Sequence, residues 1–167
     1  MELALACFLT LAHTGMRLLE LLALGLPDLD PAAERAILRG SKPGQDRVVF
    51  LTPALVDALY CFLSWRPELP EEARVFVLHQ HSPTPRPIQR RLSKYGTRAG
   101  FDVSPHDLRH TLATWLLNQG MPIHSLSKLL GHQYLITTQI YAILYDQTMY
   151  QHFRKTTARL GSLTVDG

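Results

Sequence analysis

Ser104-Pro105-His106-Asp107-Leu108-Arg109-His110 is the stretch of this 167-residue sequence that indicates most about its fold. Serine followed by proline is typical of a helix start, because serine caps the first turn and proline suits the first helical position. We therefore predict a helix from His106 to about Asn118, ended by Gly120. Residues three apart share a helix face, so His106 and Arg109 should point to the same side.

More helices are predicted after this one. Pro122 should start a short helix that ends at Gly131, because glycine commonly follows the last helical turn. His132 comes directly after that glycine, and Tyr141 comes nine residues later. Two further helices are expected over residues 137–145 and 146–160.

The N-terminal part of the chain also predicts helices. Glu2 to about Ala12 is largely apolar and is followed by Gly15, and residues 17–24 carry leucines at helical spacing. The apolar start is far too short to span a bilayer and lacks the positive residues of a signal peptide. Cys7 and Cys61 both lie in apolar, helix-like runs, which predicts two buried free thiols in a reducing cytoplasm.

A small β region follows. Residues 36–38 and 48–50 are short strand candidates, and Pro43-Gly44 between them suits a type II turn. We therefore predict a hairpin with Lys42 at its tip. Thr52 and Pro53 should begin a helix that ends near Trp65, and the apolar run 75–78 is a candidate third strand. The fold class is mainly α with a small antiparallel β-sheet.

Residues 79–87 read as a loop, and residues 87–99 read as an amphipathic helix. One stripe of that helix is apolar: Ile88, Leu92, Tyr95 and Ala99. Another is basic: Arg90, Arg91, Lys94 and Arg98. The whole chain carries a net charge of +3, a pI of about 9.0 and 46% hydrophobic residues. The length and the hydrophobic content are typical of one globular domain. The mildly basic charge is compatible with nucleic-acid binding, but it is equally compatible with a protein surface that binds no nucleic acid.

Four motifs, in this order and spacing, resemble the catalytic domain of the tyrosine recombinases, the phage integrase family. They are Thr14-Gly15-Met16-Arg17-Leu18-Leu19-Glu20, His106 to His110, Leu130-Gly131-His132, and Tyr141 within Thr137-Thr138-Gln139-Ile140-Tyr141. The resemblance covers about Leu3 to Arg159. It implies the integrase catalytic-domain fold and an enzyme that cuts and rejoins DNA through a 3′-phosphotyrosyl intermediate, with no metal and no cofactor.

The resemblance also assigns the catalytic residues: Arg17, Lys42, His106, Arg109, His132 and Tyr141. Tyr141 would be the nucleophile, since the competing tyrosines at 134, 145 and 150 lack its offset from His132. The planar forks of two arginines suit the non-bridging phosphate oxygens, and a guanidinium-rich pocket favours a phenolate whose reference pKa is near 10. His132 would donate to a phosphate oxygen, His106 would assist proton removal, and Lys42 would protonate the leaving 5′-oxygen.

Several of these residues have alternative interpretations. His106 and His110 are spaced like a zinc pair, but Asp107 replaces the glutamate of a metalloprotease helix and no third ligand is spaced nearby. A zinc hydrolase is therefore disfavoured, no metal site is predicted, and His110 is expected to be a structural residue hydrogen-bonded in the core. Lys42 lies in Ser41-Lys42-Pro43-Gly44 rather than the commoner Gly-Lys-Gly loop, so an exposed turn lysine remains the alternative. A solvated helix face remains the alternative for the basic stripe.

The expected function is site-specific recombination or integration of double-stranded DNA by a cytoplasmic, DNA-associated enzyme. Self-association on DNA is expected, with the C-terminal helix as a candidate contact, and no membrane partner or small-molecule cofactor is expected. Type IB topoisomerases share the chemistry, but the Leu-Gly-His and Thr-Thr-x-x-Tyr patterns favour a recombinase. The alternative is a non-catalytic DNA-binding remnant that modulates a full-length recombinase. Family members usually carry a helical domain ahead of the catalytic one, and we expect residues 1–167 to be a catalytic domain without it and without its usual first helix.

Overall fold

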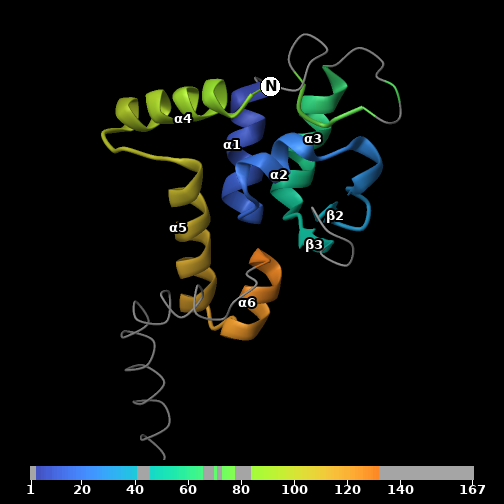
Figure 1. The fold of residues 1–167 in the computed structure, drawn as a ribbon, viewed down its shortest axis with the longest axis vertical. Helices are drawn as coiled ribbons and strands as arrows, with labels where there is room; N and C mark the ends of the chain where they lie inside the picture. Colours follow the sequence, from blue (N-terminus) through green and yellow to red (C-terminus); the bar gives the residue numbers. More distant parts are fainter. Residues whose placement is uncertain (1–2, 41–45, 66–69, 71–72, 78–83, 132–167) are drawn as a thin grey trace, which may run out of the picture. The chain divides into compact units, whose positions relative to one another are not determined.

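The computed structural model describes residues 3–40, 46–65, 70, 73–77 and 84–131. The chain divides into two compact units, Met1–Leu112 and Ala113–Gly167. Within the described residues the fold is mainly helical with one small antiparallel sheet (Figure 1), which confirms the predicted class. In chain order the elements are α1 (Leu3–Thr14), α2 (Leu18–Ala23), the 3-10 helix η1 (Leu26–Asp28), β1 (Leu29–Asp30), β2 (Arg35–Leu38), β3 (Arg47–Phe50), α3 (Pro53–Ser64), α4 (Pro85–Ala99), α5 (Pro105–Asn118) and α6 (Ile123–Leu130).

The first unit is organised around α1, which packs against α2, α3 and α4. Its core combines small and large apolar side chains, including Leu11, Met16, Leu21, Leu55 and Phe76. Burying such side chains is the main stabilising contribution to a domain of this size, at about 25 cal/mol per Å² of apolar surface.

The two cysteines differ in environment, so the prediction of two buried thiols is only half right. Cys7 is fully buried, and its burial raises the pKa of its thiol to about 12. Cys61 is exposed. The buried side chains of α3 are Leu55, Leu59 and Phe62, at spacings of four and three; Cys61 therefore lies beside that stripe and not within it.

The sheet has the order β1-β2-β3 with antiparallel pairing throughout. Ala36 pairs with Val49 and both are completely buried, whereas Arg35 and Phe50 at the next pair are exposed. The predicted hairpin is confirmed in its two strands, and its tip lies outside the described residues.

The predicted third strand over 75–78 is wrong for the described residues 75–77. The third strand is instead the two-residue β1, and residues 73–75 make only an isolated antiparallel bridge in which Gly25 opposes Arg74. The apolar run reflects burial in the core, since Val75 and Phe76 are both fully buried. Phe76 stacks on Phe62 with ring centroids 5.7 Å apart.

Helix starts follow the predicted chemistry in most places. Thr52 caps α3 by accepting a hydrogen bond from the backbone N–H of Leu55, as its position before Pro53 predicts. Helix α4 begins at Pro85, two residues earlier than predicted, because proline is tolerated in a first turn whose N–H groups have no helical partner.

The buried stripe of α4 consists of Ile88, Leu92 and Gly96. Ile88 and Leu92 are confirmed, whereas the predicted Tyr95 and Ala99 are exposed. A Cβ placed on Gly96 would lie 2.5 Å from Val103 Cγ1 and 2.7 Å from the carbonyl oxygen of Phe101. Glycine therefore lets the chain after α4 fold back closely onto the helix.

In the second unit the structure describes residues 113–131. Ala113 and Leu117 of α5 pack with Leu126 and Leu130 of α6, and Gly131 ends α6 with φ of 66°. These helices are confirmed as predicted. The helices predicted over 137–145 and 146–160 lie outside the described residues.

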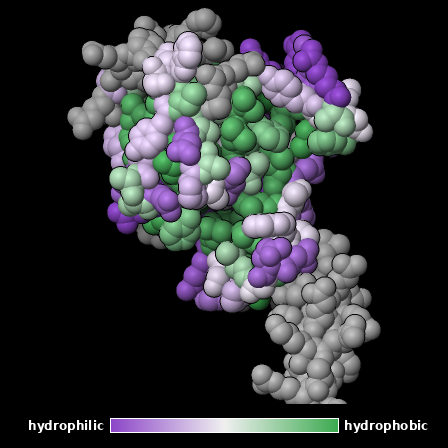
Figure 2. Space-filling view, turned by 180° about the vertical axis from the view of Figure 1, so that it is seen from behind, coloured by the Kyte–Doolittle hydropathy of each residue, from purple (hydrophilic) through white to green (hydrophobic). Residues whose placement is uncertain are grey.

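On the face that Figure 2 shows, hydrophobic residues gather toward the middle of the larger described part, and hydrophilic residues lie mostly around its edge. None of the described helices is long and apolar enough to cross a membrane.

Candidate functional site

The turn between α1 and α2 is fixed by the Thr14-Gly15-Met16 sequence. The Thr14 hydroxyl donates to the carbonyl of Thr10 at 2.6 Å and accepts from the backbone N–H of Met16 at 3.3 Å. Gly15 has φ of 63°, a left-handed conformation that glycine adopts without a steric cost. The helix therefore ends abruptly, and Arg17 comes immediately after the turn as the N-cap of α2.

Arg109 of α5 reaches this same turn. Its Nη1 donates to the carbonyl oxygen of Gly15 at 2.6 Å, and only 4% of the residue is exposed. The bond joins residues 94 positions apart. It places the buried guanidinium against a turn that lies two residues before Arg17. The two predicted arginines therefore belong to one region of the first unit.

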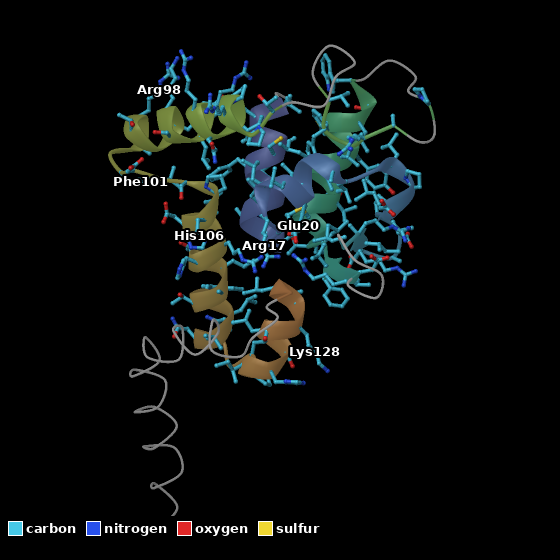
Figure 3. All side chains as sticks on the ribbon, in the orientation of Figure 1. Arg17, Glu20, Arg98, Phe101, His106 and Lys128 are labelled. Carbon is cyan, nitrogen blue, oxygen red and sulfur yellow. The ribbon has the colours of Figure 1, made fainter. Side chains whose placement is uncertain are left out.

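Arg17 is held by Glu20, one turn along α2 (Figure 3). Oε2 of Glu20 accepts from the Arg17 backbone N–H at 2.6 Å, and Oε1 accepts from Arg17 Nη1 at 3.0 Å. The first of these bonds is the return half of a capping box. The Arg17 side chain stays 50% exposed, whereas that of Glu20 is 18% exposed.

Glu20 binds a second arginine at the start of β3. Arg47 donates to both carboxylate oxygens, from Nη1 at 2.6 Å and from Nη2 at 2.7 Å. Burial raises the pKa of the Glu20 carboxyl, but the hydrogen bonds from Arg47 and Arg17 outweigh it and hold that pKa below its usual range. Glu20 is therefore an anion that binds two cations.

His106 and His110 lie at the start of α5. His106 is exposed, and its ring meets that of His110 edge to face with centroids 4.9 Å apart. His110 is half-buried, so its predicted place in the core is wrong. The helix start itself is a capping box, since Ser104 Oγ accepts from the Asp107 backbone N–H at 3.3 Å and the Asp107 carboxylate accepts from the Ser104 backbone N–H at 2.9 Å. The Ser104 hydroxyl also donates to that carboxylate, and the bonds from Ser104 lower the pKa of Asp107.

The described residues contain no group of three or more histidines, cysteines, aspartates and glutamates that could hold a metal ion. The His106–His110 pair has only Asp107 beside it on the helix, and Asp107 is engaged by Ser104. No metal ligand set can therefore be assembled from this part of the chain.

All four predicted basic residues of α4 are exposed. At 3.6 residues per turn, Arg90, Lys94 and Arg98 lie on the side of the helix opposite the buried stripe, and Arg98 projects outward (Figure 3). Residues 85–99 contain no aspartate or glutamate. The charged residues on the outer face of α4 are therefore all basic, and they also include the exposed Arg86, which was not among the predicted basic residues.

Three predicted site residues, Lys42, His132 and Tyr141, lie outside the described residues. Of the other predicted catalytic residues, Arg109 binds the α1–α2 turn that directly precedes Arg17, and His106 is exposed one turn before Arg109 on α5. Sequence reasoning missed three partners: the Gly15 carbonyl, Glu20 and Arg47. The contact of Glu20 with Arg17 could have been predicted, because Glu20 comes three residues after Arg17, which is the spacing of a capping box. Arg47, which is 27 residues from Glu20, had none.

Residues 2–148 match the family model described as the phage integrase family. The chain is 37% identical over 150 residues to the tyrosine recombinase XerA of Thermococcus onnurineus, covering 89% of this chain and 52% of that protein. Its fold matches a crystal structure of XerA recombinase with a TM-score of 0.80 and 31% identity, over 92% of this chain and 56% of the other.

A more distant match shows the same fold. The structure of the Tn1549 transposon integrase in complex with transposon right end DNA has a TM-score of 0.73 and 19% identity, over 93% of this chain and 58% of the other. The chain spans about half the length of the curated relatives it matches. The family match, together with the XerA similarity, establishes that the chain belongs to the phage integrase family of tyrosine recombinases.

Proposed function

We propose that this chain is the catalytic domain of a site-specific DNA recombinase or integrase that cuts and rejoins DNA without a metal ion. The observation that carries the proposal is the anchoring of Arg109 on the Gly15 carbonyl, next to Arg17. Two arginines from distant parts of the chain are thereby available for one anionic group. Planar guanidinium forks match two phosphate oxygens, which supports a phosphodiester as the substrate.

The proposed reaction is a transesterification. The Tyr141 phenolate attacks phosphorus, a bond from the tyrosine oxygen to the 3′-phosphate forms, and the bond to the 5′-oxygen breaks. Lys42 gives its proton to that 5′-oxygen, so a 5′-hydroxyl leaves. Attack of a 5′-hydroxyl on the phosphotyrosyl bond reverses the step and rejoins the strand.

The other site residues stabilise the charge that develops on the phosphoryl oxygens. Arg17 and Arg109 bind non-bridging oxygens, and His132 donates a hydrogen bond to one of them. His106 assists removal of the phenol proton as a general base. The two arginines, Lys42 and the histidines supply the positive charge that a divalent cation supplies in metal-dependent nucleases.

The outer face of α4 is the proposed DNA contact. Arg90, Arg91, Lys94 and Arg98 would neutralise backbone phosphates, which gives affinity without sequence specificity. A protein with the same fold has been solved with transposon end DNA, which supports double-stranded DNA as the partner. We further propose that residues 1–167 act as one catalytic domain and that the protein works in the cytoplasm. We also propose that copies associate on DNA through the segment 146–160, for which the sequence predicts a helix.

A nicked suicide substrate tests this function. The nick lets the short fragment after the cleavage site diffuse away, so any phosphotyrosyl intermediate accumulates as a covalent adduct. We expect an adduct that migrates as the protein plus the labelled strand, forms equally in EDTA and in Mg²⁺, and disappears on protease treatment. DNA binding without any adduct would instead identify the non-catalytic DNA-binding remnant, and cleavage that needs Mg²⁺ would contradict the mechanism.

A further inference from the structure

Glu20 has two partners that differ in role and in burial. Arg47 contacts the carboxylate with both arms of its fork, at 2.6 and 2.7 Å, while the Arg17 guanidinium contacts it once, at 3.0 Å. The Arg47 side chain is 14% exposed and that of Arg17 is 50% exposed. The shorter, bidentate and more buried pair is therefore Glu20 with Arg47, and Arg17 is the accessible member of the group.

The charges of this group matter for binding an anion. A carboxylate beside Arg17 attracts its guanidinium and competes with any phosphate for the same donors. Arg47 brings one positive charge and two hydrogen bonds to that carboxylate, so the three side chains together carry a net charge of +1. Without Arg47, Glu20 and Arg17 would form a neutral pair, with both carboxylate oxygens available to the Arg17 fork.

The backbone holds Arg47 in place for this contact. Arg47 is the first residue of β3 and pairs with Leu38 at the end of β2. Asp46, directly before it, accepts from the backbone N–H of Gly40 at 2.9 Å and from Arg39 at 3.3 Å. The base of the hairpin is therefore fixed on both strands, and Arg47 starts from a rigid position.

We propose that Arg47 is a positioning residue for phosphodiester cleavage: it holds and neutralises the Glu20 carboxylate, so that Glu20 orients Arg17 through a single guanidinium bond and does not capture the whole fork. The proposal rests on the function proposed above, because it assigns Arg17 a phosphate. Arg47 acts through Glu20 and not on the substrate. Its removal should therefore affect the cleavage step more than the affinity for DNA.

The test compares Arg47→Met with the double variant Glu20→Gln/Arg47→Met in single-turnover cleavage of the suicide substrate. Arg47→Met should slow cleavage on the order of 10²-fold, as expected when a catalytic group is misplaced, with the Kd for DNA changed less than about threefold because Arg17 is one of many phosphate contacts. The double variant should be at least about fivefold faster than Arg47→Met, because neutral glutamine accepts from the Arg17 backbone N–H but does not capture its side chain.

Matched variants separate this role from a merely structural one. Arg35→Met removes an exposed arginine that pairs with Asp30 on the same sheet, and it should leave the cleavage rate unchanged. Arg47→Lys keeps the charge but loses the fork, so its rate should lie between wild type and Arg47→Met. Melting temperatures identify variants that unfold, and Arg47→Lys keeps the test decisive if Arg47→Met does not fold.

The result that overturns the proposal is a double variant no faster than Arg47→Met, or an Arg47→Met rate equal to wild type. An independent readout is the pKa of Glu20, followed through the pH dependence of its side-chain carboxyl carbon signal by NMR. That pKa should rise in Arg47→Met and stay unchanged in Arg35→Met. If the wild-type chain forms no adduct, the proposed function fails, while an unchanged Glu20 pKa in Arg47→Met overturns the role of Arg47 by itself.

Discussion

Arg109 donates to the carbonyl oxygen of Gly15 at 2.6 Å, and this bond joins the start of α5 to the turn that precedes Arg17. A buried guanidinium needs its donors satisfied, and the Gly15 carbonyl satisfies one of them without bringing a formal negative charge. The bond thus fixes the orientation of the arginine and preserves its attraction for an anion.

Replacing Arg109 with lysine should therefore cause a severe defect. Lysine keeps the charge but cannot reach the Gly15 carbonyl and bind two phosphate oxygens in one plane, so we expect a loss in cleavage rate on the order of 10²–10³-fold. Single-turnover cleavage measures it. Arg98→Lys on the exposed face of α4 is the control and should cleave normally, and a near wild-type rate for Arg109→Lys would exclude it from the site.

The proposed general acid can be tested by changing the leaving group. Lys42→Ala should slow cleavage of ordinary DNA but should be restored by a 5′-bridging phosphorothiolate, because a thiolate leaves without being protonated. Cleavage rates on the two substrates are compared with those of the Arg109→Lys variant, which the sulfur should not rescue. Equal defects of Lys42→Ala on both substrates would mean that Lys42 has another role.

Gly96→Ala should destabilise the fold, although alanine usually stabilises a helix relative to glycine by about 1 kcal/mol. The added Cβ would lie 2.5 Å from Val103 Cγ1 and 2.7 Å from the Phe101 carbonyl oxygen. Overpacking of this kind costs about 1–3 kcal/mol, measured by denaturant unfolding. Gly25→Ala, whose Cβ would make only ordinary contacts at 3.4 Å, should change stability by less than about 0.5 kcal/mol. A more stable Gly96→Ala would show that the close contact with residues 101–103 does not form.

The basic face of α4 predicts a salt effect. Each phosphate contact contributes about −0.9 to the slope of log K against log salt, so changing Lys94 and Arg98 to glutamine should reduce the slope by roughly 1.8. The control changes Arg35 and Arg39, which are paired with Asp30, Asp28 and Asp46, and should leave the slope unchanged. An unaltered slope in the Lys94/Arg98 variant would remove α4 from the DNA interface.

Features set by neighbouring residues could be predicted from the sequence. Thr52-Pro53, Ser104-Pro105 and Gly131 mark helix ends through local hydrogen bonds and backbone geometry, and the structure has helix ends at each of them. The hairpin strands followed from two short strand candidates on either side of the Pro43-Gly44 turn. The mainly helical fold with one small sheet could therefore be predicted without knowledge of any tertiary contact.

Features set by contacts between residues far apart in the sequence could not be predicted. The two-residue strand β1 is too short to show an alternation of apolar and polar residues. The apolar residues Val75 and Phe76 are buried in the core but do not form a strand of the sheet. Gly96 is buried because residues 101–103 return onto α4, and Cys61 is exposed because of how α3 is rotated. In the proposed site, Arg17 and Arg109 were predicted from motifs, but the bonds from Arg47 to Glu20 and from Arg109 to Gly15 depend on the folded chain.

The most direct measurement of the central claim is covalent attachment of the suicide substrate to Tyr141→Phe and to Tyr145→Phe. Losing one hydroxyl should leave the DNA affinity of each variant close to wild type. We predict that wild type and Tyr145→Phe form the protein–DNA adduct and that Tyr141→Phe forms none. An adduct with Tyr141→Phe and none with Tyr145→Phe would contradict Tyr141 as the nucleophile.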